Sequence, residues 1–528
     1  MTSEKIVNLF IDNGFMITPD TLKYLEGLNI KNRENLIRTV IYRAKSLAHK
    51  PIVITRKFIM DLTPEQKNIE YRKQIEKQTD SISNDIKINN KQKLRDSLSS
   101  RKVSKFHAKD IEPIIELDSD PTGNLVGSGC IEDIHKYFLD RFNSLKSLLK
   151  KRRDSKDAIT IKAALDSKGT DEKVKIIGMV KEKEESKDKK NNNLFNYFIE
   201  LEDLDDSIRV FIPGSNDELV KIASHLVLDQ VICVEGVIRS DILIAENIYF
   251  PDIPNKKHQN NVNEPVSVVL LSDLHFGSKK FLSENFSRFI DWLYGKIGNE
   301  KQKELAFTVK YILISGDLID GVGVYPGHEK NLSVIDIKGQ YELAAEYLSK
   351  IPEYISIIII PGGAHDAVRK ALPQEAIPRK YAKELYDLEN TIMLGNPSFL
   401  RVHGARTIMY HGEGFDDIIP SIPGLSYANC ENAMVEFLKS RHLAPIYGKK
   451  VGLSPEPYDW LVIRDIPDIL HCGHTHITRT LKYKGVSVVN SGTFQAETEY
   501  QQSLGIKPTP GIVPIIKLSD FSIRLKRF

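Results

Sequence analysis

The segment Val266-Ser-Val-Val-Leu-Leu-Ser-Asp-Leu-His275 decides the fold of the C-terminal half of this chain. Its apolar run has the character of a buried β-strand and ends just before Asp273 and His275. A second such run, Tyr311-Ile-Leu-Ile314, ends just before Gly316-Asp317. Open α/β sheets gather the carboxyl ends of their strands at one edge, where ligands bind. We therefore expect the polar residues that follow these two runs to lie at one site.

Three further short segments also combine Gly with His or Asp: Gly362-Gly-Ala-His-Asp366, His411-Gly412 and Gly473-His-Thr-His476. One convergent cluster is the simplest account of all five. Sites made only of carboxylates favour Mg or Ca, whereas imidazole brings in Mn, Fe or Zn. Two divalent ions bridged by Asp317 would grip a phosphate, lower the pKa of a bound water and stabilise an in-line displacement at phosphorus. The sequence thus predicts a phosphoesterase with two divalent ions, Mn foremost, with Mg, Fe and Zn as alternatives.

In this order the patches resemble the calcineurin-type metallophosphoesterase family, whose pattern is D-x-H, G-D, G-N-H-D, H and G-H-x-H, over about residues 266–520. The resemblance implies two stacked sheets wrapped by helices, with the ions at the edge of the sheets. It implies that the first ion is held by Asp273, His275, Asp317 and His476, and the second by Asp317, His411 and His474. It also implies that His365 protonates the leaving oxygen or orients the phosphate, and that Asp366 fixes the imidazole tautomer of His365.

One position departs from that pattern, because Ala364 stands where the family has the Asn whose amide oxygen binds the second ion. The second ion would have three protein ligands or borrow water, which predicts weaker binding. The alternative function is accordingly a catalytically weak or inactive scaffold. Arg369, just after this loop, would hold a phosphate bidentately or form a structural salt bridge, and both interpretations stay open. Asp416, Asp417 and Glu497 lie off the ligand pattern and are expected to be surface or loop-anchoring residues.

A narrower resemblance rests on Ile111–Glu116, on Pro361–Arg369 with Ala371–Glu375, and on Asn490–Glu499 with Pro508–Gly511. These segments resemble the small subunit of archaeal family D DNA polymerase. The resemblance implies a large polymerising subunit as partner, single-stranded or primer–template DNA as substrate, and a 3′–5′ proofreading exonuclease. The eukaryotic relatives, the B subunits of replicative polymerases, have lost the metal ligands and serve as scaffolds. A free-standing phosphoesterase for nucleotides or phosphoproteins is a third hypothesis, which the additional N-terminal domains argue against.

The composition sets limits on partners and location. Lys and Arg number 74 and Asp and Glu 71, so the formal net charge is only +3 and any contact with DNA must be local. The four cysteines have no C-x-x-C spacing, so neither a disulfide framework nor a structural zinc site is indicated. No apolar run reaches the roughly 20 residues of a membrane span, and the N-terminus lacks a signal-peptide core. We expect a soluble cytoplasmic protein with no membrane partner.

The chain of 528 residues is too long for one core, and we expect an α+β multidomain protein. Residues 1–58 show helical spacing and predict a small helical domain. Residues 59–105 are rich in Lys, Asn, Gln, Ser and Asp and predict a disordered linker. Residues 106–170, with a helical stripe from Ile131 to Leu149, are expected to pack on the domain that follows.

That domain, residues 171–255, is predicted to be an oligonucleotide/oligosaccharide-binding (OB) barrel. Three β-like runs, a helix and two more runs follow one another in the order of that fold. The runs are Val174–Val180, Leu194–Glu202, Ile208–Ile212, Gln230–Ile238 and Ile242–Phe250, with the helix at Glu218–His225. Residues 266–528 are then expected to form the metallophosphoesterase α/β two-sheet sandwich.

Overall fold

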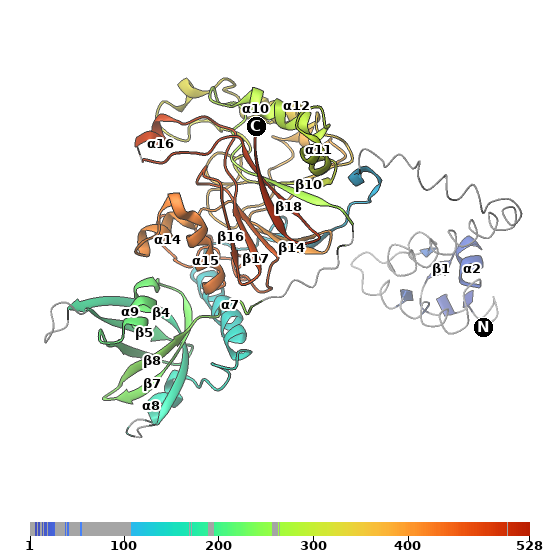
Figure 1. Cartoon of the computed structure of the whole chain (residues 1–528). Helices are drawn as coiled ribbons and strands as arrows, with labels where there is room; N and C mark the ends of the chain where they lie inside the picture. Colours follow the sequence, from blue (N-terminus) through green and yellow to red (C-terminus); the bar gives the residue numbers. More distant parts are fainter. Residues whose placement is uncertain are drawn as a thin grey trace, which may run out of the picture. The chain divides into compact units, whose positions relative to one another are not determined.

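The computed structural model describes residues 107–528, apart from 168, 170–171, 188–194, 256–261, 263 and 504, together with single residues and short runs between 6 and 54. The chain divides into two compact units, Met1–Val103 and Ser104–Phe528 (Figure 1). The predicted linker, residues 59–105, lies outside the described residues.

The N-terminal unit contains helix α2 (Pro19–Glu26) and two short strands, β1 (Met16–Ile17) and β2 (Val53–Ile54), which pair in parallel. Its small core includes Phe10 and Leu25. The sequence predicted helices in this region but not the strand pair, because a strand of two residues leaves no alternating pattern to detect.

A closed five-stranded barrel forms the first part of the second unit, with its strands in the order β4-β5-β6-β8-β7. Its elements are β4 (Lys173–Lys187), β5 (Phe195–Glu202), β6 (Ser207–Ile212), α9 (Asp217–His225), β7 (Val231–Arg239) and β8 (Ile242–Tyr249). This is the predicted order of three strands, a helix and two strands. Strand β4 continues to Lys187 instead of ending at Val180, because its charged outer half pairs with β5. The residues of this extension are mostly charged and exposed, so a search for apolar runs does not detect them.

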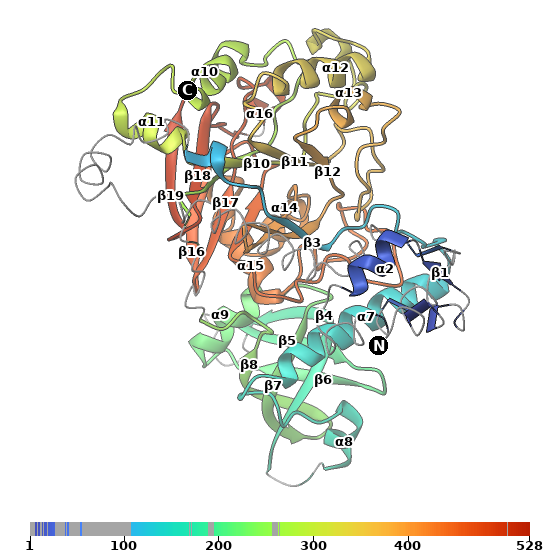
Figure 2. The same cartoon turned by 90° about the vertical axis from the view of Figure 1, so that its right-hand side faces the viewer.

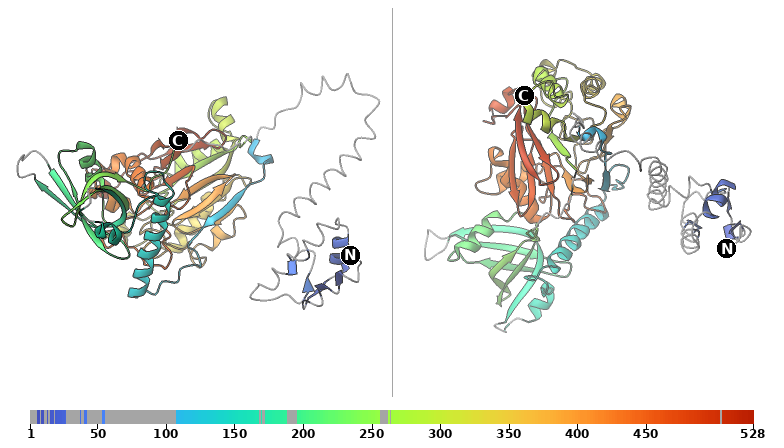
Figure 3. Two further views of the ribbon diagram at one scale, coloured as in Figure 1. Left: turned by 90° about the horizontal axis from the view of Figure 1, so that it is seen from below. Right: turned by 45° about the vertical axis from the view of Figure 1, so that its right-hand side comes forward.

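Helix α7 (Ile131–Lys150) packs against both the barrel and the rest of the unit. Phe142, Leu145 and Leu149 contact a cluster that holds barrel residues and also Val462. The buried Arg141 Nε lies 2.8 Å from Asp459 Oδ2. In both views of Figure 3 the cyan helix stands beside the green barrel. Helix α7 therefore connects the barrel to the domain that follows.

Residues 106–170 were expected to pack on the barrel, and strand β3 (Ile115–Ser119) is an exception. It pairs antiparallel with β13 (Ser398–Val402) at the edge of a sheet of the C-terminal domain (Figure 2). The short helix α8 (Ile161–Asp166) does contribute Ile161 and Ala164 to the barrel core. The prediction for this segment was wrong for β3, because strand pairing between such distant segments leaves no local signal.

The first sheet of the C-terminal domain has the strand order β12-β11-β10-β9-β18-β19. Its strands are β9 (Ser267–Leu271), β10 (Val309–Ser315), β11 (Ser356–Ile360), β12 (Thr391–Met393), β18 (Ile512–Lys517) and β19 (Ser522–Arg527). Strands β9 to β12 are parallel, and β18 joins β9 antiparallel. Every residue of β9, β10 and β11 is buried, which explains their continuous apolar runs.

The second sheet has the order β16-β17-β15-β14-β13-β3. Its remaining strands are β14 (Ala405–Met409), β15 (Ile469–Cys472), β16 (Arg479–Tyr483) and β17 (Val486–Asn490). Strand β15 pairs in parallel with both β14 and β17. The carboxyl ends of these three strands therefore lie at one edge of the sheet.

The two sheets face each other across a shared core. Val268 and Leu270 of the first sheet lie in one cluster with Met409 and Val489 of the second. The alternate residues of β9 face α10 (Ser283–Leu293), α11 (Glu300–Ala306) and α12 (Ile337–Leu348). Helices α14 (Phe415–Ser421) and α15 (Cys430–Ser440) cover the outer face of the second sheet. The two-sheet arrangement implied by the sequence is the one observed.

Two negative findings apply to the described residues alone. They include no helix that is both long and apolar enough to cross a bilayer. The four cysteines are free thiols, and only Cys130 is exposed.

Candidate metal centre

All five polar patches follow the carboxyl ends of parallel strands. Asp273, Asp317 and His365 lie in the loops after β9, β10 and β11 of the first sheet, and His411 and His474 in the loops after β14 and β15 of the second. Backbone bonds join the loops, since Asp273 N donates to Gly316 O and Gly473 N to His411 O. The backbone N–H of His474 also donates to the Asp273 carboxylate, which links the two sheets. The predicted convergence is therefore observed.

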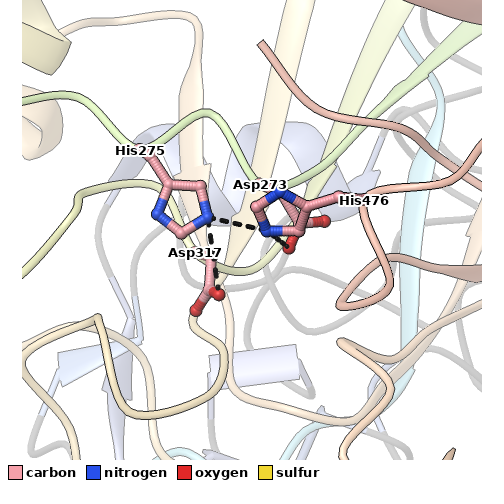
Figure 4. Close-up of side chains that lie close together, drawn as sticks. All are labelled: Asp273, His275, Asp317 and His476. Carbon is pink, nitrogen blue, oxygen red and sulfur yellow. Dashed lines mark hydrogen bonds and ion pairs between the residues drawn. The ribbon is translucent and has the colours of Figure 1, made fainter. Parts of the chain in front are cut away.

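Four of the predicted residues form a tight cluster, which is named here the first position. Asp273, His275, Asp317 and His476 have ligand atoms within 4.8 Å of one another, and all four are buried (Figure 4). His275 Nε2 lies 3.1 Å from His476 Nε2 and 3.8 Å from Asp317 Oδ2. His476 Nε2 lies 3.4 Å from Asp273 Oδ1. Two imidazoles and two carboxylates around one point form a donor set suited to Mn, Fe or Zn.

The backbone at this cluster adopts a conformation that non-glycine residues seldom take. The φ angles of Asp273, His275, Asp317 and His476 are 52°, 51°, 48° and 59°. Each such residue costs on the order of 1 kcal/mol or more, and the strain persists only where the surrounding structure imposes it. Gly316 has φ +83°, and a Cβ there would lie 2.4 Å from His411 Nδ1, so only glycine fits. The strain is concentrated where the candidate ligands are, as expected of a functional site.

Residues outside the motifs hold the two imidazoles of the first position. Asp320 Oδ1 lies 3.0 Å from His275 Nδ1, and it also accepts a hydrogen bond from Gln495 Nε2. Gln501 Nε2 lies 2.7 Å from His476 Nδ1. Because Asp320 and Gln501 lie on the Nδ1 side of these rings, each ring presents Nε2 to the cluster, the usual arrangement behind metal-binding histidines. Sequence reasoning missed both: Asp320 follows Asp317 by three residues and was open to detection, whereas Gln501 carries no signal.

The second position is centred on Asp317 and His411. His411 Nε2 lies 3.5 Å from Asp317 Oδ2, while His411 Nδ1–H donates to Ser315 O at 2.9 Å and so leaves Nε2 with a lone pair. Within the described part of the chain, His411 Nε2 and Asp317 Oδ1 are buried without a hydrogen-bond partner. Unpaired buried polar atoms are expensive, and a divalent cation would satisfy both. These residues therefore fit a metal ion.

His474, the other predicted ligand of this second position, faces a carboxylate. Its Nε2 lies 3.1 Å from Asp416 Oδ1, and its ring centroid is 5.1 Å from that of His411. Asp416 was expected to be a surface or loop-anchoring residue. Its carboxylate accepts from Tyr427 OH and pairs with Lys450, as a loop anchor does, and it also contacts a candidate ligand, which the sequence did not indicate. Asp417 accepts from the backbone N–H groups of Lys450 and Val451, the predicted loop-anchoring role.

Gly363, and not Ala364, faces the second position. Ala364 is exposed. A Cβ on Gly363 would lie 2.8 Å from Asp317 Oδ1 and 3.2 Å from His411 Nε2, the two unpaired atoms named above. The sequence-based assignment of the missing amide ligand to Ala364 was therefore wrong by one residue. The loop contains one residue more than G-N-H-D between its first Gly and His365, so counting back from the histidine selected the wrong position.

Glu413 joins the loop of Gly363 to that of His411. Its Oε1 accepts from Gly363 N at 3.2 Å and from Asn396 Nδ2 at 2.9 Å, while Asn396 Oδ1 accepts from His411 N. Both Glu413 and Asn396 are buried. Sequence reasoning passed over Glu413 although it lies two residues after His411.

His365 and Asp366 lie in the same loop but do not contact each other in the way the sequence implied. His365 Nδ1 is 2.6 Å from the backbone oxygen of Asp320, to which it donates, and Nε2 lies 3.9 Å from Asp317 Oδ2. Asp366 accepts from Gly362 N, Leu318 N and Tyr341 OH. The expectation that Asp366 fixes the tautomer of His365 was wrong: the Asp320 carbonyl does so, and Asp366 braces the loops.

Arg369 forms the structural salt bridge that the sequence left open. Its Nε donates to Pro373 O at 2.7 Å and its Nη2 lies 3.2 Å from Glu456 Oε1, whose side chain is buried. A role in holding phosphate stays a prediction.

The pKa values of the candidate ligands show at which residues a proton would compete with a metal ion. Burial raises the pKa of Asp273 to about 6. Burial opposes protonation of His275, but Asp320, Asp317 and Asp273 outweigh it and raise its pKa to about 9. Burial would also raise the pKa of Asp317, yet the imidazolium of His411 outweighs burial and holds it below its usual range. Imidazolium protons thus balance the buried carboxylates, and metal binding would release them.

Comparisons with known proteins identify relatives of this chain by sequence. Residues 268–479 match the family model for the B subunits of DNA polymerases alpha and epsilon. The chain is 42% identical to the DNA polymerase II small subunit of Methanothermobacter thermautotrophicus, over 77% of this chain and 83% of that protein. It is 42% identical to the DNA polymerase II small subunit of Methanocaldococcus jannaschii, over 81% of this chain and 70% of that one. A solved archaeal phosphodiesterase covers 50% of this chain at 13% identity, with a TM-score of 0.26.

Proposed function

The chain belongs to the DNA polymerase II small-subunit family, and we propose that it is the proofreading exonuclease subunit of such a polymerase. The reaction is metal-dependent hydrolysis of the terminal phosphodiester at the 3′ end of single-stranded DNA. The large polymerising subunit is the proposed partner, and primer–template DNA the proposed source of the substrate. The barrel is proposed to be of the OB class, since its strands and helix have that order.

The observation that carries this proposal is the donor set of the first position together with the unpaired atoms of the second. Asp273, His275, Asp317 and His476 would hold one ion, and Asp317 and His411 the other, with His474 completing the set if it leaves Asp416. Divalent ions in such a pair supply Lewis-acid activation of the phosphate and lower the pKa of a bound water. We propose Mn foremost, because imidazole and carboxylate ligands are mixed.

His365 is proposed to act on the phosphate. Because Nδ1 donates to the Asp320 carbonyl, only Nε2 is available to the substrate. Burial lowers the pKa of His365, so the free protein presents an unprotonated Nε2. A phosphate anion beside that nitrogen would raise the pKa again. His365 would then hold a proton between phosphate and leaving oxygen, as a general acid requires.

A catalytically weak scaffold is the second candidate function. Two observations favour it, since Gly363 presents no side chain to the second position and His474 faces Asp416. Both weaken the second position and leave the first intact.

The test compares two substrates with Mn on the full chain: a primer with a mismatched 3′ end, and a small aryl phosphodiester. Shortening of the primer from its 3′ end, stopped by EDTA and restored by Mn, is the expected result. Hydrolysis of the small diester without primer shortening would support a free-standing phosphodiesterase. Inactivity on both, with and without the large subunit, would support the scaffold.

A further inference from the structure

A cavity of about 500 Å³ lies where three parts of the second unit meet. Its walls come from the C-terminal end of α7 and the turn after it, from the chain that leaves the barrel at residues 251–255, and from loops of the second sheet. This volume lies within the range of ligand pockets, about 300–1,000 Å³. We name it the basic cavity.

The basic cavity lies at the opposite edge of the second sheet from the metal centre. Arg406 and Lys484 line it near the amino ends of β14 and β17, whereas His411 follows the carboxyl end of β14. Strands β14, β15 and β17 are parallel, so their amino ends share one edge. With about 3.3 Å per residue, these strands separate the two edges by about 15 Å. The cavity is therefore not a subsite of the metal centre.

Seven cationic side chains line the basic cavity against three carboxylates, Asp154, Asp252 and Asp465, which is a formal excess of four positive charges. The cations are Lys151, Arg152, Arg153, Arg406, Arg441, Arg464 and Lys484. Four of them are paired, Arg152 with Asp154, Lys484 with Asp252, Arg406 with Asp465, and Arg464 with Asp140, which lies outside the lining. Among the described residues, no carboxylate pairs with Lys151, Arg153 or Arg441. Three cations that line the cavity thus form no ion pair.

Arg441 is the most deeply buried of these three cations. It is only 2% exposed, and it lies just after α15 with φ 55°. Its Nε and Nη2 donate to the backbone oxygens of Ile463 and Arg464, which carry no charge. Burial lowers the pKa of Arg441 to about 10. Asp465 and Asp252 oppose that shift but form no ion pair with Arg441. A buried guanidinium without a paired anion is costly, so an anionic ligand in the cavity would reduce a penalty already present in the fold.

A neighbouring cavity of about 110 Å³ extends the surface toward an aromatic side chain. It shares Arg406 and Arg464 with the basic cavity and reaches Tyr458, which is 38% exposed. The guanidinium carbon of Arg464 lies 3.9 Å from the centroid of the Tyr458 ring. Arg464 thus covers one face of the ring, and the exposed part of Tyr458 lies beside the cationic pocket. Aromatic rings beside cationic grooves are the combination with which proteins hold a base and its phosphate.

From these observations we propose that the basic cavity binds a phosphate group, supplied by a single-stranded nucleic acid or by a free nucleotide. Phosphate fits better than a lone carboxylate, because it can balance several of the unpaired cations at once and suits the guanidinium fork. Phosphate binding in the basic cavity requires no metal ion, so it can be tested independently of the proposed nuclease activity.

The test is binding by the full chain in EDTA, so that metal-dependent phosphate binding is absent. One probe is a fluorescent oligothymidylate of about 12 nucleotides, and the other is inorganic phosphate followed by calorimetry. The variant is K151E/R153E, since both side chains are exposed. The matched control is R288E/K338E, which reverses one Arg and one Lys on exposed positions of α10 and α12. Arg441→Gln is a second variant, scored only if its melting temperature shows that it folds.

K151E/R153E should weaken oligothymidylate binding about tenfold, and the slope of log affinity against log salt should fall by about 1.4, or 0.7 for each lost contact. The control should leave both unchanged. Weakening with the oligonucleotide alone identifies a nucleic-acid backbone as the ligand, and weakening with inorganic phosphate as well identifies a free phosphate or nucleotide. Binding of both probes equal to that of the control would overturn the proposal. Loss of assembly with the large subunit, with both probes unaffected, would also overturn it, because the cavity would then hold protein.

Discussion

The first and second positions of the metal centre share Asp317 and differ in almost everything else. The first has four converging donors whose backbone is strained into place and whose imidazoles are held by Asp320 and Gln501. The second has two unpaired atoms, a glycine where an amide would lie, and a histidine that faces a carboxylate. In the proposed two-metal centre, the loop of Gly363 would therefore leave the first position complete and the second weakened. Catalysis that needs both ions is then limited by the weaker position.

Loss of the shared ligand should have the largest effect. Asp317→Asn removes the bridging charge from both positions, so hydrolysis should fall about 10³-fold or more, since ions in such pairs contribute several kcal/mol and each 1.36 kcal/mol is tenfold. EDTA should lower the rate of hydrolysis to the same extent in the unchanged protein, and added Mn should restore it. The rate of primer shortening and the bound Mn are measured together, with Asp291→Asn on the surface of α10 as the control. Full activity in the Asp317 variant would end the two-metal account.

His365→Ala should have the second largest effect on the rate of hydrolysis. The substitution removes a group proposed to act on the phosphate and leaves all the proposed metal ligands in place. We expect a loss of about 10²-fold in rate, the usual scale of a general acid, with unchanged Mn content. His135→Ala, an exposed histidine on α7, is the control. A fall in bound Mn that parallels the rate would show that His365 is a ligand instead.

The difference in Mn affinity between the two positions should become smaller if an amide side chain is introduced at residue 363. Gly363→Asn should tighten the second Mn by about 10- to 100-fold, since Asn tolerates the local φ of +58° better than other side chains. The Asp317 carboxylate must shift slightly, because a Cβ would lie 2.8 Å from it. Ala364→Asn, one residue along, is the matched control and should leave the Mn titration unchanged. The reverse result would restore the assignment made from sequence.

Proton competition should affect Mn binding at the first position over a defined range of pH. Asp273 and His275 have pKa values of about 6 and about 9 and must lose their protons to bind an ion. Affinity at the first position should therefore rise with pH up to about 9, by up to tenfold per unit between about 6 and 9, where His275 alone is protonated, and more steeply below about 6, where Asp273 is protonated as well. Calorimetry in buffers of different ionisation enthalpy counts these protons. An affinity independent of pH would show that the ligands are already unprotonated.

The sequence predicted the strand ends well and the supporting contacts poorly. Asp273 and Asp317 follow long apolar strands, so their placement depends on local pattern alone, and the first position follows from it. Gln501 and the pairing of β3 with β13 are contacts between distant segments, for which one sequence holds no period or motif. Ala364 was misassigned because a loop insertion shifts the count by one, and only the direction of the backbone at Gly363 shows which residue faces Asp317 and His411.

The inequality of the two positions is tested most directly by titrating Mn into the full chain while both bound ion and primer shortening are followed. We predict two separate binding steps, the second at least about tenfold weaker than the first, with hydrolysis appearing only during the second. A single step that fills both positions with one affinity, or hydrolysis that is complete after the first ion, would contradict it.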